Sequence, residues 1–227
     1  MLGILRNDPW LEPYAEAIEG RHEDVKKKLR QLQKAGGGKL TDFANAYKYY
    51  GLHRQQDGSW VLRELAPNAT AIYLVGTFNG WQKQEQYAFH KLDGGKWEIV
   101  LPPDALHNGD LYKLLIEWPG GSGERIPAYA TRVVQDENTK IFSAEVYAPE
   151  TPYQFEVQDF KPDVRPLLIY ECHIGMAQQE EKVGTYDEFR RLVLPRIAKD
   201  GYNAIQIMAI QEHPYYGSFG YHNEFPS

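Results

Sequence analysis

The chain has 227 residues, and a prior of roughly 150 residues per domain allows one large domain or two small ones. Hydrophobic residues make up 42% of it and charged residues 25%, which is ordinary for a globular protein, and the net charge of −6 argues against non-specific binding of nucleic acid. One cysteine excludes an internal disulfide framework, and no apolar run approaches the roughly 20 residues of a membrane span. Because the start of the chain also lacks the layout of a secretory signal, we expect a cytoplasmic protein without a membrane partner.

The first 50 residues have a helical pattern. Asp8 is a candidate N-cap, a proline follows it at the first helical position, and apolar residues then recur at helical spacing. A second helix is predicted over 22–34 and ends at the three glycines 36–38. A third, short helix is predicted over 41–50. The segment 1–50 is therefore expected to be helical.

Residues 51–148 change to the pattern of short strands separated by turn residues. Asn79-Gly80 and the glycines around 94 and 120 are such turns. Strands at this regular spacing, in about 100 residues, predict a small β-sandwich. The candidate strands are 59–65, 70–76, 87–91, 96–101, 110–117 and 141–146.

Residues 149–166 are expected to form a linker, and 167–227 have the pattern of one βαβ unit. The apolar run 167–170 predicts a strand buried on both faces, and 204–210 predicts a second strand. Between them, Thr185 and Glu188 have the spacing of a capping box at the start of a helix. The two strands are expected to be parallel and joined by a right-handed crossover.

Two stretches in the predicted sandwich resemble a known module. Residues 65–70 read Leu-Ala-Pro-Asn-Ala-Thr, and residues 74–81 read Leu-Val-Gly-Thr-Phe-Asn-Gly-Trp. They resemble carbohydrate-binding module family 48, a sandwich associated with starch and glycogen. Trp-Glu-Ile at 97–99 and Gly-Asp-Leu-Tyr-Lys at 109–113 fall where that family has its next strands.

The βαβ region carries a second resemblance. Residues 169–175 read Ile-Tyr-Glu-Cys-His-Ile-Gly, and 208–217 read Met-Ala-Ile-Gln-Glu-His-Pro-Tyr-Tyr-Gly. These motifs are similar to the start of the catalytic barrel in the 1,4-α-glucan branching enzymes of glycoside hydrolase family 13. The resemblance implies a mixed, α+β fold. Its parts would be N-terminal helices, an immunoglobulin-like β-sandwich and the first βαβ unit of an incomplete (β/α)8 barrel.

Sugar rings present a face of C–H groups on which flat aromatic side chains stack, so exposed tryptophans are the candidates for glucan binding. Trp81 follows a turn, and Lys113 lies in a predicted strand; by the resemblance, both match positions that bind glucan in some family 48 modules. Trp118, at a strand end beside a glycine-rich loop, corresponds more loosely. Trp60 and Trp97, inside strands, are expected in the core.

Retaining glycosyl transfer requires a carboxylate nucleophile and a carboxylic acid/base roughly 5–5.5 Å apart. The resemblance places these groups on later barrel strands, so no catalytic residue is expected within this chain. It implies substrate contacts for Tyr221 and for Glu212, His213 and Tyr215 on the loop after the second strand. Glu171 and Glu212 are the alternative acid/base pair, to which the resemblance gives structural roles instead.

The remaining reactive side chains form no compact set. His213 and His222 lack the further ligands that a metal site needs, so neither a metal nor an organic cofactor is implied. Cys172 lies next to a predicted buried strand and is expected to be an inert packed thiol.

The sequence thus predicts part of a branching enzyme, which cleaves α-1,4 glucan and transfers the segment to form α-1,6 branches in glycogen biosynthesis. The partner expected is an α-glucan such as glycogen, starch or a maltooligosaccharide. We expect the chain to be a truncated N-terminal fragment without activity of its own. A stand-alone glucan-binding module or scaffold is the alternative. A debranching enzyme or a trehalose-forming hydrolase is a third class, against which the run 208–217 argues.

Overall fold

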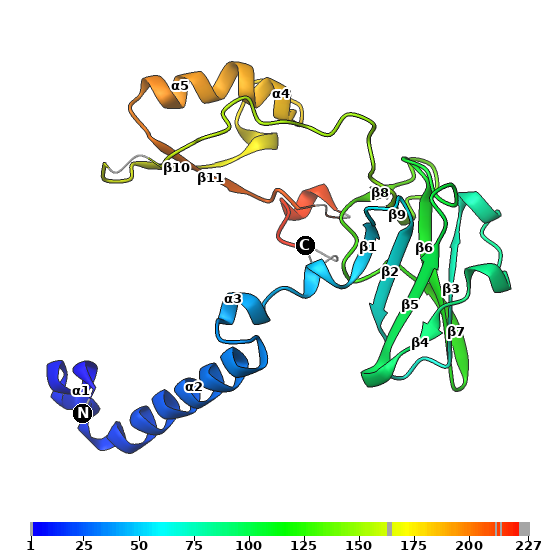
Figure 1. Ribbon diagram of the computed structural model, residues 1–227. Helices are drawn as coiled ribbons and strands as arrows, with labels where there is room; N and C mark the ends of the chain where they lie inside the picture. Colours follow the sequence, from blue (N-terminus) through cyan, green and yellow to red (C-terminus); the bar gives the residue numbers. More distant parts are fainter. Residues whose placement is uncertain (1, 163–164, 212, 214, 223–227) are drawn as a thin grey trace. The chain divides into compact units, whose positions relative to one another are not determined.

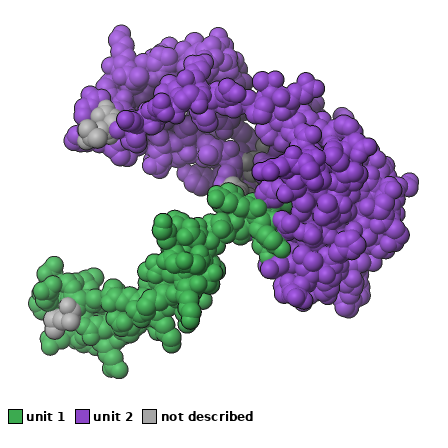
Figure 2. Space-filling view, viewed as in Figure 1, with its two compact units in different colours: residues 1–51 green, residues 52–227 purple. Residues whose placement is uncertain are grey.

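The computed structural model describes residues 2–162, 165–211, 213 and 215–222. It divides into two compact units, Met1–Gly51 and Leu52–Ser227 (Figure 2). Within the described residues, no helix is both long enough and apolar enough to cross a membrane.

The N-terminal unit is helical, as predicted (Figure 1). It consists of α1 (Gly3–Asn7), a 3-10 helix (Pro9–Tyr14), α2 (Ala15–Ala35), α3 (Leu40–Phe43) and a second 3-10 helix (Ala46–Lys48). The Asp8 side chain accepts a hydrogen bond from the backbone N–H of Trp10 at 3.0 Å, which confirms the predicted N-cap.

The predicted helix boundaries in this unit were partly wrong. The helix predicted to start at residue 22 is the second half of α2, which runs unbroken from Ala15 through Gly20. A single glycine costs a helix only about 1 kcal/mol relative to alanine and does not end it without a cap. The helix ends at Gly36, followed by Gly37 in the left-handed region at φ 85°. The helix predicted over 41–50 is two short helices, α3 and the 3-10 helix that follows it.

Two antiparallel sheets follow. The first has the order β1 (Gly51–Arg54), β2 (Trp60–Leu65), β5 (Lys96–Leu101) and β4 (His90–Lys91). The second has the order β3 (Ala71–Gly76), β6 (Leu111–Trp118), β9 (Phe142–Glu145) and β8 (Val133–Gln135), with β7 (Gly121–Arg125) also paired to β6. The two sheets form the predicted sandwich.

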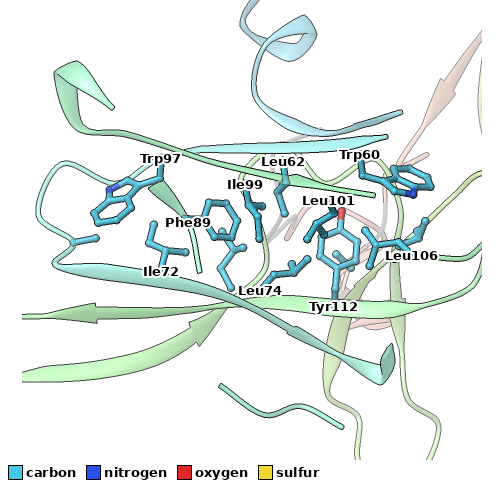
Figure 3. Packing of buried hydrophobic residues seen from close by; sticks show 14 residues of the cluster. Trp60, Leu62, Ile72, Leu74, Phe89, Trp97, Ile99, Leu101, Leu106 and Tyr112 are labelled. Atoms are coloured by element: carbon cyan, nitrogen blue, oxygen red, sulfur yellow. The ribbon is translucent and has the colours of Figure 1, made fainter. Parts of the chain in front are cut away.

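The core lies between the two sheets (Figure 3). Alternate residues of β2 and β5 point into it from one side and alternate residues of β3 and β6 from the other, as the period of a strand requires. Trp60 and Trp97 are 4% and 3% exposed, so their predicted core positions are confirmed. The buried set is Trp60, Leu62, Ala69, Ile72, Leu74, Phe89, Trp97, Ile99, Leu101, Leu106, Tyr112, Leu114, Ala144 and Val146.

The strand predictions were correct for β2, β3, β5, β6 and β9 within a residue or two. The strand predicted at 87–91 is only His90–Lys91, because residues 85–87 form a 3-10 turn. Three strands were not predicted: β1, β7 and β8. β7 reads Gly-Ser-Gly-Glu-Arg and has none of the β-branched or aromatic residues that mark a strand in sequence.

The last part is the predicted βαβ unit. Strands β10 (Ile169–His173) and β11 (Ala204–Met208) are parallel, with Ile169 opposite Ala204. The connection contains α4 (Tyr186–Glu188), a π-helical turn (Phe189–Val193) and α5 (Leu194–Lys199). The capping box is confirmed: the Thr185 hydroxyl accepts from the Glu188 N–H at 3.2 Å, and the Glu188 carboxylate accepts from the Thr185 N–H at 3.0 Å.

The apolar run 167–170 was predicted to be a strand buried on both faces, and this was wrong. The strand begins at Ile169, and Leu167, Leu168 and Ile169 are 62%, 56% and 51% exposed. In the described residues β10 pairs with β11 alone, and most of its residues are exposed. A small cluster of Cys172, Ile174, Phe189 and Ile197 packs there.

Candidate functional site

The turn before Trp81 is built by the Asn79 side chain and by the backbone of Leu74 and Gly76. The Asn79 amide accepts from the Gly76 N–H at 2.9 Å and donates to the Leu74 carbonyl at 3.0 Å. Gly76 lies so close to β6 that a Cβ there would overlap the Leu111 carbonyl oxygen. The turn therefore requires glycine at 76 and asparagine at 79, and it fixes where Trp81 leaves the sheet.

Trp81 and Lys113 meet on the outer face of the second sheet. Lys113 Nζ lies 5.7 Å from the centre of the Trp81 ring, and Glu124 Oε2 on β7 lies 3.3 Å from the same Nζ. The Lys113 side chain is only 13% exposed, whereas Trp81 is 37% exposed. The Lys113 ammonium is thus held in place beside the accessible indole of Trp81. This geometry would allow a sugar ring to stack on the indole with its hydroxyls within reach of the ammonium.

A second lysine on this face is held in the same way. Lys83 Nζ lies 4.3 Å from the centre of the Tyr73 ring on β3 and 2.6 Å from Glu117 Oε1 on β6. Its partnership with Glu117 raises the pKa of Lys83. No sequence pattern predicts this second pairing, because Lys83 lies in a loop and its two partners are 10 and 34 positions away.

Trp118 does not join Trp81 and Lys113. Side chains alternate along β6, so Lys113 is on the outer face while Tyr112, Leu114, Ile116 and Trp118 are on the inner one. The Trp118 ring lies against Gly121 and Gly123 of β7, where a Cβ would come within 3.2 Å of it.

Trp118 instead borders a groove of about 790 Å³ on the sandwich. Its walls are mostly apolar and come from the chain after β2, from β6 and from the segment after β7. They include Leu65, Pro67, Asn68, Ile116, Pro119, Arg125, Ile126 and Ala128.

Glu64 is the buried carboxylate of this groove, 7% exposed. Its two oxygens accept the N–H groups of Leu65 and Ala128, each at 3.0 Å. Burial raises the pKa of Glu64 against the opposite effect of these hydrogen bonds. The carboxylate thus links Ala128, in the segment after β7, to β2.

The substrate contacts predicted on the segment after β11 have different surroundings. Glu212 lies outside the described residues. His213 stacks on Tyr216 at 6.4 Å between ring centres, with Nδ1 3.0 Å from the Gln211 carbonyl oxygen. Tyr215 and Tyr221 are 65% and 78% exposed, and the Tyr221 hydroxyl contacts Met208 Sδ at 3.9 Å.

Sequence reasoning missed the grouping around His173. Its ring lies 6.3 Å from those of both Tyr216 and Phe219, and in the described residues neither of its buried nitrogens has a hydrogen-bond partner. With His213, it borders a cavity of about 270 Å³. The position of His173 at the end of β10 could have indicated this grouping, since barrel sites form at the carboxyl ends of strands.

The other candidates for chemistry have structural surroundings. Glu171 accepts from the Gln206 amide at 3.2 Å across the β10–β11 pair. Cys172 is buried, as predicted, and burial raises the pKa of its thiol. No group of three or more His, Cys, Asp or Glu that could hold a metal occurs among the described residues.

Residues 49–130 match the family model of carbohydrate-binding module 48 (isoamylase N-terminal domain). This range contains β1 to β7 and the paired Trp81 and Lys113. This match agrees with the resemblance of the 65–70 and 74–81 motifs to carbohydrate-binding module family 48.

Nearly the whole chain is related to 1,4-alpha-glucan-branching enzymes, which confirms the second resemblance. It is 40% identical over 228 residues to the enzyme of Yarrowia lipolytica, covering 97% of this chain and 33% of that protein. It is 37% identical over 226 residues to the enzyme of Dictyostelium discoideum, covering 96% and 32%. The chain spans about a third of the length of these relatives.

Solved structures share the fold. The pullulanase from Bacillus acidopullulyticus superposes with a TM-score of 0.57 at 16% identity, over 73% of this chain and 22% of that one. The GBS pullulanase SAP in complex with maltotetraose gives a TM-score of 0.57 at 17% identity, over 73% and 24%. At these identities the likeness establishes the fold alone.

Proposed function

We propose that the sandwich binds α-glucan on its outer face, with Trp81 as the stacking platform and Lys113 as the polar contact. The observation that carries the proposal is the position of the Lys113 ammonium beside the exposed Trp81 ring, fixed by Glu124. A sugar ring could stack on the indole and direct its hydroxyls to the ammonium. The groove at Trp118 is a second candidate surface for glucan.

We propose that this glucan binding takes part in the branching of 1,4-α-glucan, because the chain is similar to branching enzymes. We further propose that the 227-residue chain binds glucan without catalysing branching. A (β/α)8 active site is assembled from the ends of eight strands, and the described residues provide two of them, β10 and β11. In this proposal the substrate of such a barrel contacts Tyr215, Tyr221, His213 and Glu212.

Glycogen biosynthesis in the cytoplasm is the setting we propose. A single buried thiol suits a reducing compartment, where disulfides are rare. The alternative, a glucan-binding module that acts without catalysis, is favoured by one observation: the sandwich has its own complete core between its two sheets.

The binding proposal is tested by calorimetric titration of the purified chain with maltoheptaose. Trp81→Ala is expected to weaken binding about tenfold, through the loss of one aromatic stacking surface. Trp10→Ala is the matched control, because Trp10 is 87% exposed in the N-terminal unit. Equal affinity of the wild type and Trp81→Ala would refute the assignment of Trp81.

Branching is tested separately by incubating the chain with amylose. We expect no loss of iodine colour and no new α-1,6 linkages. Branches formed by the chain alone would overturn the second half of the proposal and favour a pair of carboxylates such as Glu171 and Glu212.

A further inference from the structure

The outer face of the second sheet carries a polar strip that the Trp81 platform does not explain. Along β6, Lys113, Leu115 and Glu117 point to this face, because they alternate with the core residues. Lys113 is at one end of the strip with Trp81 and Glu124, and Glu117 is at the other end with Lys83 and Tyr73.

The two ends have the same construction. At each, a lysine ammonium lies over an aromatic ring and is paired with a glutamate from a neighbouring segment of the sheet. These contacts hold the charged groups in place on a flat surface. Each pair still has free hydrogen-bonding capacity, since an ammonium has three donors and a carboxylate about four acceptor sites.

The ends are separated by more than one sugar ring. Lys113 and Glu117 are four residues apart on β6, about 13 Å at the rise of a strand. Between them lies Leu115, half-buried, with Glu124 opposite it on β7. A surface on which the apolar side chain of Leu115 lies between two held ion pairs matches an oligosaccharide, whose rings are apolar on their faces and polar at their rims.

We propose that the glucan site runs along β6 and that Lys83 and Glu117 form a second subsite, which binds the hydroxyls of a sugar unit beyond the one stacked on Trp81. The ligand is an α-1,4-linked oligosaccharide long enough to reach both ends. This inference rests on the proposed glucan binding at Trp81.

Tyr73 has a supporting part in this subsite. It is 9% exposed and lies beneath Lys83, so it is not itself a stacking platform. Its hydroxyl is 3.4 Å from Glu85 Oε1, which fixes the ring that supports the lysine. The second subsite would therefore contribute hydrogen bonds rather than stacking.

The test is the dependence of affinity on glucan length, measured by titration with maltotriose and with maltoheptaose. In the wild type, we expect tighter binding of maltoheptaose. The double variant Lys83→Ala with Glu117→Ala is expected to weaken maltoheptaose binding about threefold to tenfold and to leave maltotriose binding unchanged. The matched control is Glu23→Ala with Lys26→Ala, which removes an exposed ion pair of 3.0 Å from α2.

The outcomes separate this inference from the proposed function. If Trp81→Ala weakens both sugars but the Lys83/Glu117 variant binds both like the wild type, the second subsite is wrong and the platform remains. If Trp81→Ala changes neither, the proposed function fails. A circular dichroism spectrum and an unfolding midpoint like those of the wild type show that the variant is folded. Should it unfold, Lys83→Gln with Glu117→Gln repeats the test, with a smaller expected loss.

Discussion

Trp81 has a backbone conformation that few non-glycine residues adopt, with φ 61° in the left-handed region. Such a conformation costs of order 1–3 kcal/mol and persists where surrounding contacts over-determine it. Here the Trp81 N–H donates to the Gly76 carbonyl at 2.9 Å, and Asn79 bonds both Gly76 and Leu74. This strain at an exposed aromatic side chain supports the proposal that Trp81 contacts a ligand, because the conformation itself lowers stability.

The buried carboxylate of Glu64 predicts how the stability of the protein changes with pH. Its folded-state pKa is raised by burial, so the protonated form is favoured on folding and the stability it contributes is fully present below the unfolded pKa, near 4.5. This contribution is lost as pH rises through the raised folded-state value.

The measurement is the urea midpoint of the wild type and Glu64→Gln at several pH values from 4 upward. The wild type is expected to lose stability relative to the variant as pH rises across this window. We compare how the urea midpoint of each protein changes with pH. This comparison removes the pH-independent cost, in the variant, of placing an amide against the Leu65 and Ala128 N–H groups. A difference that stays flat with pH would contradict the prediction.

At the scale of elements, the capping box shows what local sequence can determine. Thr185 and Glu188 were predicted to start a helix, and both reciprocal hydrogen bonds are present. The π-helical turn that follows was not predictable from this pattern. It precedes Pro195, whose missing N–H cannot bond to the preceding turn of an α-helix.

The cap is tested by substitution. Thr185→Ala is expected to destabilise the start of this helix by about 1 kcal/mol, seen as faster amide hydrogen exchange in residues 186–193. Ser218→Ala, outside the helix, serves as the control. Unchanged exchange in Thr185→Ala would show that packing alone holds the helix.

Glu188 adds a pH dependence of the opposite sign to that of Glu64. Lys182 and the Thr185 N–H lower the pKa of Glu188 to about 2. Its contribution is therefore present above the ordinary value near 4.5 and is lost as pH falls toward 2. The same amides are expected to lose protection in that acidic range, and Glu188→Gln is expected to remove this loss.

At the scale of the whole molecule, the sandwich core is the largest source of stability that the structure shows. Leu74 is fully buried between the two sheets. Leu74→Ala is expected to cost about 2–5 kcal/mol of unfolding free energy, from lost burial and the cavity left behind. Val100→Ala, on the exposed face of β5 with 57% of Val100 exposed, is the control and is expected to cost far less. Similar costs for both would contradict the assigned core.

Local patterns in the sequence determined the helical start, the five clear strands, the Asn79-Gly80 turn and the family motifs. They also placed Trp60 and Trp97 in the core, because alternation along a strand is a local property. They could not show the partners of Lys113 and Lys83, since these depend on how distant strands and loops come together. The opposite faces of Lys113 and Trp118, in contrast, follow from alternation along β6. Strand register and loop path are long-range properties, and it is the tertiary structure that brings Trp81 beside Lys113 and lines a separate groove with Trp118.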